Sequence, residues 1–254
     1  MTVPAARQTL QIIKYFASHG GPVRASTVAR DLELPRSTTY HLLRVLQDEG
    51  FLLHTPESQA YALSPLLGEL GSSVVSSEAL SRLATPVLER LVAETRLPVV
   101  AHLGLLHHSD VVYAAKVSAA RAPAVVTSIG VRLPAHLTAT GRAMLAALPA
   151  SQVTAIYLDA ADLAARNGSG RVTRAALTAL LDATRERGWA TEDGDIVDDY
   201  GSVGAVVLDH NGYPAAAIGL TFRASTVDDR QWTLLGRATR SAAEALSRRV
   251  RGKL

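Results

Sequence analysis

Hydrophobic positions in the first quarter of the chain recur at helical spacing. Apolar residues three or four positions apart predict three helices, over residues 5–18, 26–32 and 36–49. On the first of these helices, Leu10, Ile13 and Ala17 recur on one face, with Ile12 and Phe16 flanking it. The third helix carries a polar stripe opposite its leucines, so one of its sides is free to contact a partner.

The pattern changes from helical to strand-like after the third helix. Two short apolar runs, 51–53 and 61–63, flank the polar segment 54–59, which predicts a β-hairpin. Three helices followed by a hairpin are typical of a winged helix-turn-helix, which we assign to residues 1–64. The spacing returns to helical over 65–95, and we interpret 65–80 as a helical linker.

Strands and helices interleave in the rest of the chain, residues 81–254. Strand-like runs are predicted over 98–104, 110–118, 122–129, 189–197, 203–209 and 214–222. Helical patterns are predicted over 138–148, 151–158, 173–187 and 228–250. The fold class is therefore α+β, with a winged helix-turn-helix joined through a linker to an α/β domain built around one sheet.

Composition narrows the class of protein. Of the 254 residues, 48% are hydrophobic and 19% are charged, which indicates a packed core. The absence of cysteine excludes disulfides and thiolate chemistry. No apolar run reaches the roughly 18 to 20 residues of a membrane span, and the N-terminus lacks the pattern of a secretory signal. We expect a cytoplasmic protein with no membrane partner.

The charge of the chain alone does not indicate which surface would bind nucleic acid. The net charge is only +3, and residues 1–60 hold six basic and five acidic side chains. Residues 237–254 are more basic, with six basic side chains and one acidic. Nucleic-acid binding by this last helix is one interpretation, and a solvated helix face is the other. A prediction of DNA binding in the first domain must therefore rest on pattern.

The polar stripe of the third helix supplies that pattern. In a helix-turn-helix, the N-terminal part of this helix enters the major groove. We expect base contacts from Thr38, Thr39, His41 and Arg44, because hydroxyls, imidazoles and guanidinium groups can reach base edges. The remaining predicted contacts with double-stranded DNA come from Arg36, Ser37 as a cap or phosphate contact, Tyr40, and His54 and Gln59 of the hairpin. Winged helices also serve as protein-interaction modules, which is the alternative.

Candidate chemistry in the second domain centres on Thr138–Gly141. A helix start with hydroxyls and free N–H groups suits a carboxylate or another acceptor, and simple N-capping is the alternative. Four histidines, His102, His107, His108 and His136, could suggest a metal, but the adjacent pair His107 and His108 lies in a predicted turn, where solvated side chains are more common. The acidic run 192–199 lacks the spacing of a calcium loop. Because phosphate-binding, dinucleotide-binding and nucleophile-elbow motifs are also missing, we predict no metal, no cofactor and no enzymatic activity.

Several motifs in one order resemble the IclR family of transcription regulators over nearly the whole chain. They are Leu32–Thr39, Thr85–Leu91, Asp110–Tyr113, Leu133–Ala143 and Gly204–Gly219. The resemblance implies a GAF/PAS-like effector domain and homodimers that can pair into tetramers. It also implies that a small-molecule effector, a small organic or aromatic acid, shifts the population of DNA-binding arrangements.

The resemblance also places the effector contacts. They map to Val126, Ser128, Ala139, Thr140, Glu192, Ser202, Gly219 and Thr221. Small residues at several of these positions leave room for a ligand. The alternative is a DNA-binding or protein-interaction module that responds to no effector.

Overall fold

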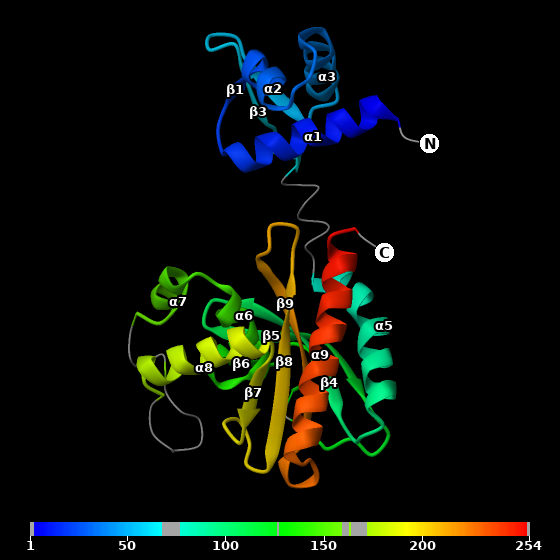
Figure 1. The fold of residues 1–254 in the computed structure, drawn as a ribbon, viewed down its shortest axis with the longest axis vertical. Coiled ribbons are helices and arrows are strands. Elements are labelled where there is room, and N and C mark those ends of the chain that lie inside the picture. Colours follow the sequence, from blue (N-terminus) through cyan, green and yellow to red (C-terminus); the bar gives the residue numbers. More distant parts are fainter. Residues whose placement is uncertain (1–2, 68–76, 126, 159–162, 164–171, 253–254) are drawn as a thin grey trace. The chain divides into compact units, whose positions relative to one another are not determined.

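The computed structural model describes residues 3–67, 77–125, 127–158, 163 and 172–252 (Figure 1). The chain divides into two compact units, Met1–Ser76 and Ser77–Leu254. Each unit has its own hydrophobic core. The two are therefore described separately.

The N-terminal unit is a winged helix-turn-helix, as the sequence predicts. Its elements are α1 (Pro4–His19), β1 (Val23–Arg24), α2 (Ala25–Asp31), α3 (Arg36–Asp48), β2 (Leu52–Thr55) and β3 (Ala60–Leu63). The strands form an antiparallel sheet in the order β1-β3-β2, so the hairpin β2–β3 is the wing. In the turn between α2 and α3, the Leu34 amide donates to the Ala29 carbonyl at 2.9 Å.

The buried face of α1 differs from the stripe of Leu10, Ile13 and Ala17. Ile12, Tyr15 and Phe16 enter the core, whereas Leu10 is 59% exposed and Ala17 is exposed. Two apolar stripes run along this helix, and helical spacing alone cannot choose between them. The stripe with the two aromatic rings buries more apolar area, which explains why it faces the core.

The C-terminal unit is built around one antiparallel sheet. Its strands are β4 (Val100–His107), β5 (Asp110–Ser118), β6 (Arg132–Pro134), β7 (Ala190–Asp193), β8 (Tyr200–Leu208) and β9 (Pro214–Arg223). Its α-helices are α5 (Ser77–Thr95), α6 (Ala139–Ala147), α7 (Ala150–Ile156), α8 (Arg174–Arg187) and α9 (Asp229–Val250), with short 3₁₀ turns at Ala135–Leu137 and Ala224–Thr226. The described strands are ordered β6-β5-β4-β9-β8-β7.

The two faces of this sheet are covered by different helices (Figure 1). On one face, α5 and α9 pack over the apolar side chains of β4, β8 and β9, among them Leu103, Val203 and Leu220. On the other face lie α6 and α8, whose core includes Met144 and Leu181. The start of α6 on that second face is where the polar residues gather.

Some predicted elements differ from the structure. The strand predicted over 122–129 is absent from its described residues, which follow an irregular course, and Val126 lies outside the described part of the chain. Most of the predicted linker, residues 68–76, also lies outside it. No helix in the described ranges is long and apolar enough to cross a membrane.

Candidate functional site

The third helix of the N-terminal unit presents the predicted polar stripe to solvent. α3 begins at Arg36, directly after Pro35, and its Leu43 and Leu46 are buried. On the opposite side Ser37, Tyr40, His41 and Arg44 are exposed, in agreement with their predicted orientation. Arg44 is held only loosely, because its Nε lies 3.9 Å from the Asp48 carboxylate and its side chain is 81% exposed. These donors are free to contact a partner.

On this helix the prediction for Thr39 is wrong, and one of the two alternatives for Ser37 is excluded. Thr39 is fully buried and its hydroxyl donates to the Pro35 carbonyl at 3.1 Å, so its side chain cannot reach a base edge. It lies four residues before Leu43 and seven before Leu46, on the face that packs inward. Ser37 is not an N-cap, because the helix begins before it and Pro35 occupies the cap position. Thr38 is half-buried.

The wing is held by contacts within the hairpin. The imidazole of His54 packs against the ring of Tyr61, with centroids 4.5 Å apart. Gln59 Nε2 donates to the Pro56 carbonyl at 2.9 Å, and Arg24 Nε donates to the Ser58 carbonyl at 3.2 Å. The side chain of Gln59 is therefore partly occupied in shaping the turn, although it remains exposed.

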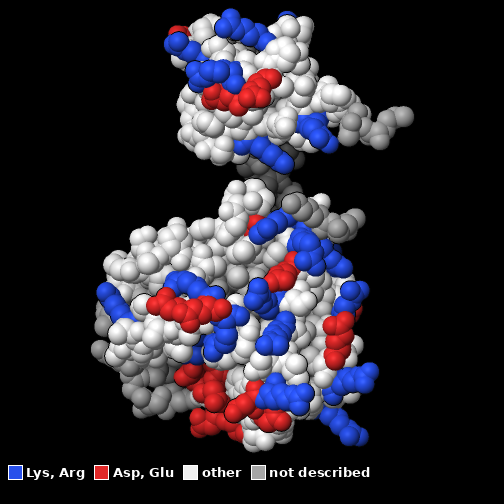
Figure 2. All heavy atoms as spheres, viewed as in Figure 1, with Lys and Arg blue, Asp and Glu red and all other residues white. Residues whose placement is uncertain are grey.

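Basic side chains gather over α9 of the C-terminal unit (Figure 2). Several of them have partners: Arg240 forms an ion pair with Glu244 at 2.9 Å, and Arg251 donates to the Asp209 carbonyl at 2.8 Å. These contacts are those of an exposed helix face, which is the plainer of the two interpretations of the basic C-terminal segment. Nucleic-acid binding by this helix remains a prediction.

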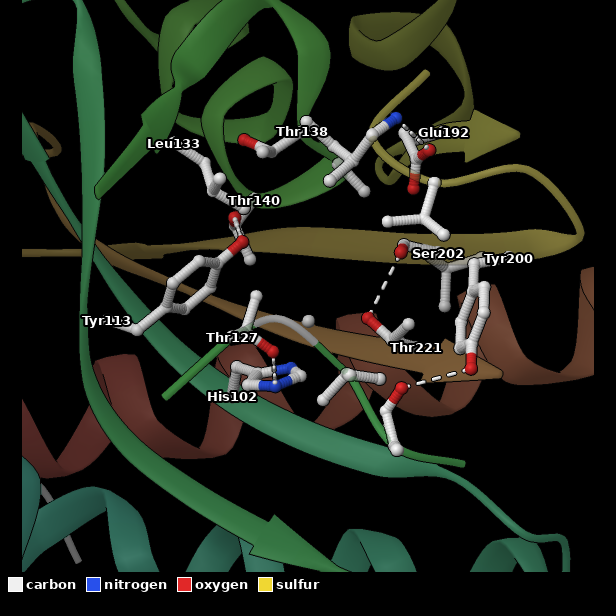
Figure 3. Close-up of a pocket in the computed structure, with 17 residues that line it drawn as sticks. His102, Tyr113, Thr127, Leu133, Thr138, Thr140, Glu192, Tyr200, Ser202 and Thr221 are labelled. Carbon is white, nitrogen blue, oxygen red and sulfur yellow. Dashed lines mark hydrogen bonds between the residues drawn. The ribbon is translucent and has the colours of Figure 1, made fainter. Parts of the chain in front are cut away.

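A cavity of about 110 Å³, lined by both polar and apolar side chains, lies between the sheet and α6 in the C-terminal unit (Figure 3). Strand register builds one wall, because Glu192 pairs with Ser202 and Ser202 pairs with Thr221 across β7, β8 and β9. The hydroxyls of Ser202 and Thr221 lie 3.0 Å apart. One row further along, His102 pairs with Gly219, which adds an imidazole to the same face.

The start of α6 forms the opposite wall of this cavity. Thr138 caps the helix by accepting a hydrogen bond from the Gly141 amide at 3.0 Å, so the capping alternative is confirmed at this residue. Thr140 points into the cavity, 3.4 Å from the Tyr113 hydroxyl. The helix can approach this closely because of Gly204, where a Cβ would lie 2.5 Å from the backbone of Ala139.

Burial sets the protonation of the ionisable groups in the cavity. It raises the pKa of the Glu192 carboxyl to about 7, although hydrogen bonds from Ser202 and from the Ile196 amide lower it. Burial also lowers the pKa of His102 to about 3, helped by the nearby Lys116 charge, and raises that of Tyr113 to about 12. Near neutral pH the imidazole and the phenol are uncharged, whereas Glu192 can take up or release a proton.

The structure brings six of the eight predicted effector residues together. The six that line the cavity are Ala139, Thr140, Glu192, Ser202, Gly219 and Thr221. The prediction of Ser128 is wrong, because its side chain is exposed and its neighbour Thr127 lines the cavity instead. Thr127 faces inward because its hydroxyl bonds to His102 Nε2. Val126 falls outside the described residues.

Other lining residues could not be found from the sequence motifs alone. The polar ones are His102, Tyr113, Thr127 and Tyr200, whereas Thr138 belongs to the segment that the sequence singled out. Tyr113 belongs to one of the family-like motifs, and it shares the buried alternate positions of β5 with Val111 and Ala115, which was an available signal. His102 sits in a run of buried residues, so its place in the cavity depends on strand pairing with β9.

The described residues contain no group of three or more His, Asp or Glu side chains arranged to hold a metal ion. His136 is buried, and its ring packs edge-on against Tyr157 with centroids 5.6 Å apart. It therefore helps to anchor the segment before α6.

Family models match both units. Residues 5–56 match the IclR helix-turn-helix domain, and residues 72–248 match the bacterial transcriptional regulator IclR C-terminal domain. The chain is 29% identical over 246 residues to the HTH-type transcriptional regulator XynR of Escherichia coli, covering 97% of this chain and 96% of that protein. It is 32% identical to the glycerol operon regulatory protein of Streptomyces griseus, covering 88% and 87%.

Solved structures show the same fold. Thermotoga maritima IclR has a TM-score of 0.64 at 23% identity, covering 97% of this chain and 98% of that chain. An IclR homologue from Microbacterium hydrocarbonoxydans, crystallised with 4-hydroxybenzoate, has a TM-score of 0.61 at 19% identity, covering 98% and 100%. Because its model matches cover most of the chain, this protein belongs to the IclR family of transcription regulators, which join a DNA-binding helix-turn-helix to a C-terminal effector-binding domain.

Proposed function

We propose that the exposed face of α3 reads operator DNA. The observation that carries this proposal is the exposure of Tyr40, His41 and Arg44 opposite the buried leucines of a recognition helix. In helix-turn-helix proteins this helix enters the major groove, where arginine and histidine donors reach base edges. Arg36 and Ser37, at the start of the helix, contact phosphates.

The rest of the proposed DNA surface comes from its neighbours. Thr38 adds a half-buried hydroxyl near the start of α3, and His54 and Gln59 add contacts from the wing to the backbone or the minor groove. In this proposal residues 1–64 form the DNA-binding domain, 65–80 the linker and 81–254 the effector domain.

The cavity beside α6 is the proposed effector site. Its concave shape, apolar walls and converging polar groups are those of small-molecule sites in general. The homologue of the same fold crystallised with 4-hydroxybenzoate supports a small organic ligand for this type of domain. The six predicted residues that line the cavity, together with Tyr113 and His102, are the proposed contacts.

We propose that the protein acts as a homodimer in the cytoplasm and that two dimers can pair into a tetramer. Support comes from α1, whose Leu10 is 59% exposed and whose Ala17 lies on the same exposed stripe. Such an apolar stripe gains free energy when a second copy covers it. A two-fold dimer presents two recognition helices to half-sites about one helical turn apart. Effector binding then shifts the population of dimer arrangements that fit the operator.

The experiment that tests DNA reading compares Arg44→Ala with an Arg230→Ala control. Arg230 is an exposed arginine at the start of α9. The specific DNA is an operator selected from a random DNA pool. Arg44→Ala weakens binding of the protein to this operator by about 1 to 3 kcal/mol and leaves its binding to random-sequence DNA almost unchanged. Fluorescence anisotropy at fixed salt measures both. An equal loss on operator and random DNA contradicts base reading by Arg44.

A further inference from the structure

We infer that the cavity beside α6 takes a small, uncharged, hydroxylated molecule that donates a hydrogen bond to Glu192. The inference rests on the proposed effector function of the cavity and narrows its ligand class. It differs from the organic acid that the family resemblance implies, and the two classes give opposite results in the experiment below.

The size of the cavity limits the ligand. Its volume is about 110 Å³. A protein cavity of about 150 Å³ accommodates benzene, which has six non-hydrogen atoms. The space beside α6 therefore suits a molecule of about six non-hydrogen atoms, such as a three-carbon polyol.

The polar part of the lining offers hydroxyls, one imidazole and one carboxyl group, and aliphatic side chains supply the rest of the lining. The hydroxyls belong to Tyr113, Thr127, Thr138, Thr140, Tyr200, Ser202 and Thr221 (Figure 3). Hydroxyls both donate and accept, so they match the hydroxyls of a ligand. Among the described residues that line the cavity there is no lysine or arginine. A carboxylate ligand would find no positively charged side chain in this lining to neutralise it.

The nearest arginine is already occupied. Arg142 of α6 is 4% exposed, and its guanidinium group donates to the His136 and Thr191 carbonyls and to Asp195, at 2.8, 2.8 and 2.7 Å. Moving it toward a ligand would break these bonds and leave Asp195 without its ion-pair partner.

The groups that face Glu192 do not make its surroundings positive. They are the Ser202 hydroxyl of β8, the Tyr113 phenol of β5, the Ile196 amide and Asp195 of the following loop, and Arg142 of α6, which pairs with Asp195. A ligand carboxylate beside the ionised Glu192 would be a second negative charge in a buried site, which is unfavourable. A ligand hydroxyl instead donates to this carboxylate, which is a strong hydrogen bond.

The start of α6 does not reverse this balance. A helix N-terminus carries the equivalent of about half a positive charge, and the Gly141 amide is already bonded to Thr138. This half positive charge of the helix is smaller than the full negative charge that Glu192 carries when the pH is above its pKa. The charge of the site therefore selects against anions near pH 8 and toward uncharged donors.

The test uses the full-length protein and matched pairs of compounds. The pairs are glycerol and glycerate, and propane-1,2-diol and lactate, with 4-hydroxybenzoate as an additional acid. Thermal shift ranks them and isothermal titration calorimetry gives Kd at pH 8 and pH 6. We expect at least one uncharged member to bind about tenfold or more tightly than its acid at pH 8. The acids gain up to about tenfold per pH unit as Glu192 takes up its proton.

Two variants test whether Glu192 causes the preference for the uncharged compound over its acid. Glu192→Gln removes the charge, so the preference for the uncharged member over its acid shrinks to less than threefold. Asp193→Asn is the matched control, because Asp193 is the next residue on β7 and its side chain is exposed. The control keeps the wild-type preference.

Three results overturn the inference: an acid that binds more tightly than its uncharged partner at pH 8, an unchanged preference in Glu192→Gln, or no binding by any uncharged compound. Binding by 4-hydroxybenzoate alone would refute the uncharged class and leave the proposed effector function standing. If no compound of either class changes operator binding, the effector function itself is contradicted.

Discussion

Around the cavity, the two faces of the sheet in the C-terminal unit carry opposite chemistry on the same strands. On β9, Leu220 is fully buried against the α5 and α9 side, whereas its neighbours Gly219 and Thr221 line the cavity on the α6 side. On β8, Val203 belongs to the apolar core and Ser202 faces the ligand space. Alternation along a strand thus lets one face supply packing energy while the other gives up packing for a cavity with polar groups.

The difference between the two faces shows which residues contribute mainly to stability and which contribute mainly to ligand binding. The α5 and α9 face is built from apolar side chains, whereas the cavity face contains a buried carboxyl that costs free energy to ionise. Substitutions on alternate residues of one strand should therefore have separable effects. The following predictions test that separation.

The largest expected effect is on the apolar face. Leu220→Ala should lower the free energy of unfolding of the C-terminal unit by about 2 to 5 kcal/mol, because it opens a cavity in the packed core. Thr221→Ala, one residue along, should cost much less and act mainly on ligand affinity. Urea denaturation followed by circular dichroism measures both. Equal losses from the two variants would show that the faces are not separable.

The second prediction concerns Glu192 and pH. Because its pKa is raised to about 7, the folded protein holds this proton more tightly than the unfolded chain, so the stabilising effect is complete below the unfolded pKa and is lost as the pH rises to 7. Relative to wild type, Glu192→Gln should gain roughly 3 kcal/mol between pH 4.5 and pH 8. Denaturant midpoints across this range measure the gain, and a pH-independent difference would contradict the raised pKa.

A smaller effect is expected from the close approach of α6 to the sheet. Gly204→Ala should cost about 1 to 3 kcal/mol, because the added Cβ meets the backbone of Ala139 and pushes the start of α6 outward. Gly21→Ala is the control, since no heavy atom lies within 4 Å of its Cβ position. Thermal unfolding measures the stability of both variants. A Gly204→Ala variant as stable as the control would mean that α6 is free to move.

Local patterns predicted much of the fold, and the failures have physical reasons. The bounds of β5 and the exposed side of α3 followed from spacing alone. On α1, two apolar stripes competed, and the larger rings of Tyr15 and Phe16 decided which one entered the core. The burial of Thr39 could have been foreseen from its spacing to Leu43.

The cavity was harder to predict because its walls are joined by contacts between distant residues. Glu192, Ser202 and Thr221 form a row only through the register of three strands. His102 and Tyr113 join them from β4 and β5, and no local spacing brings these residues together. The family resemblance located the loop before α6, whereas the depth and charge of the cavity could be predicted only from the folded structure.

The most direct test of the central claim, that the cavity controls DNA binding, is operator affinity measured with and without ligand in Thr140→Met. The ligand is the compound of the matched pairs that most stabilises the wild type, and anisotropy is read on the selected operator. The account predicts that Thr140→Met binds the bare operator with wild-type affinity and no longer responds to the compound, because the longer side chain fills the cavity. A variant that responds as the wild type does would contradict it.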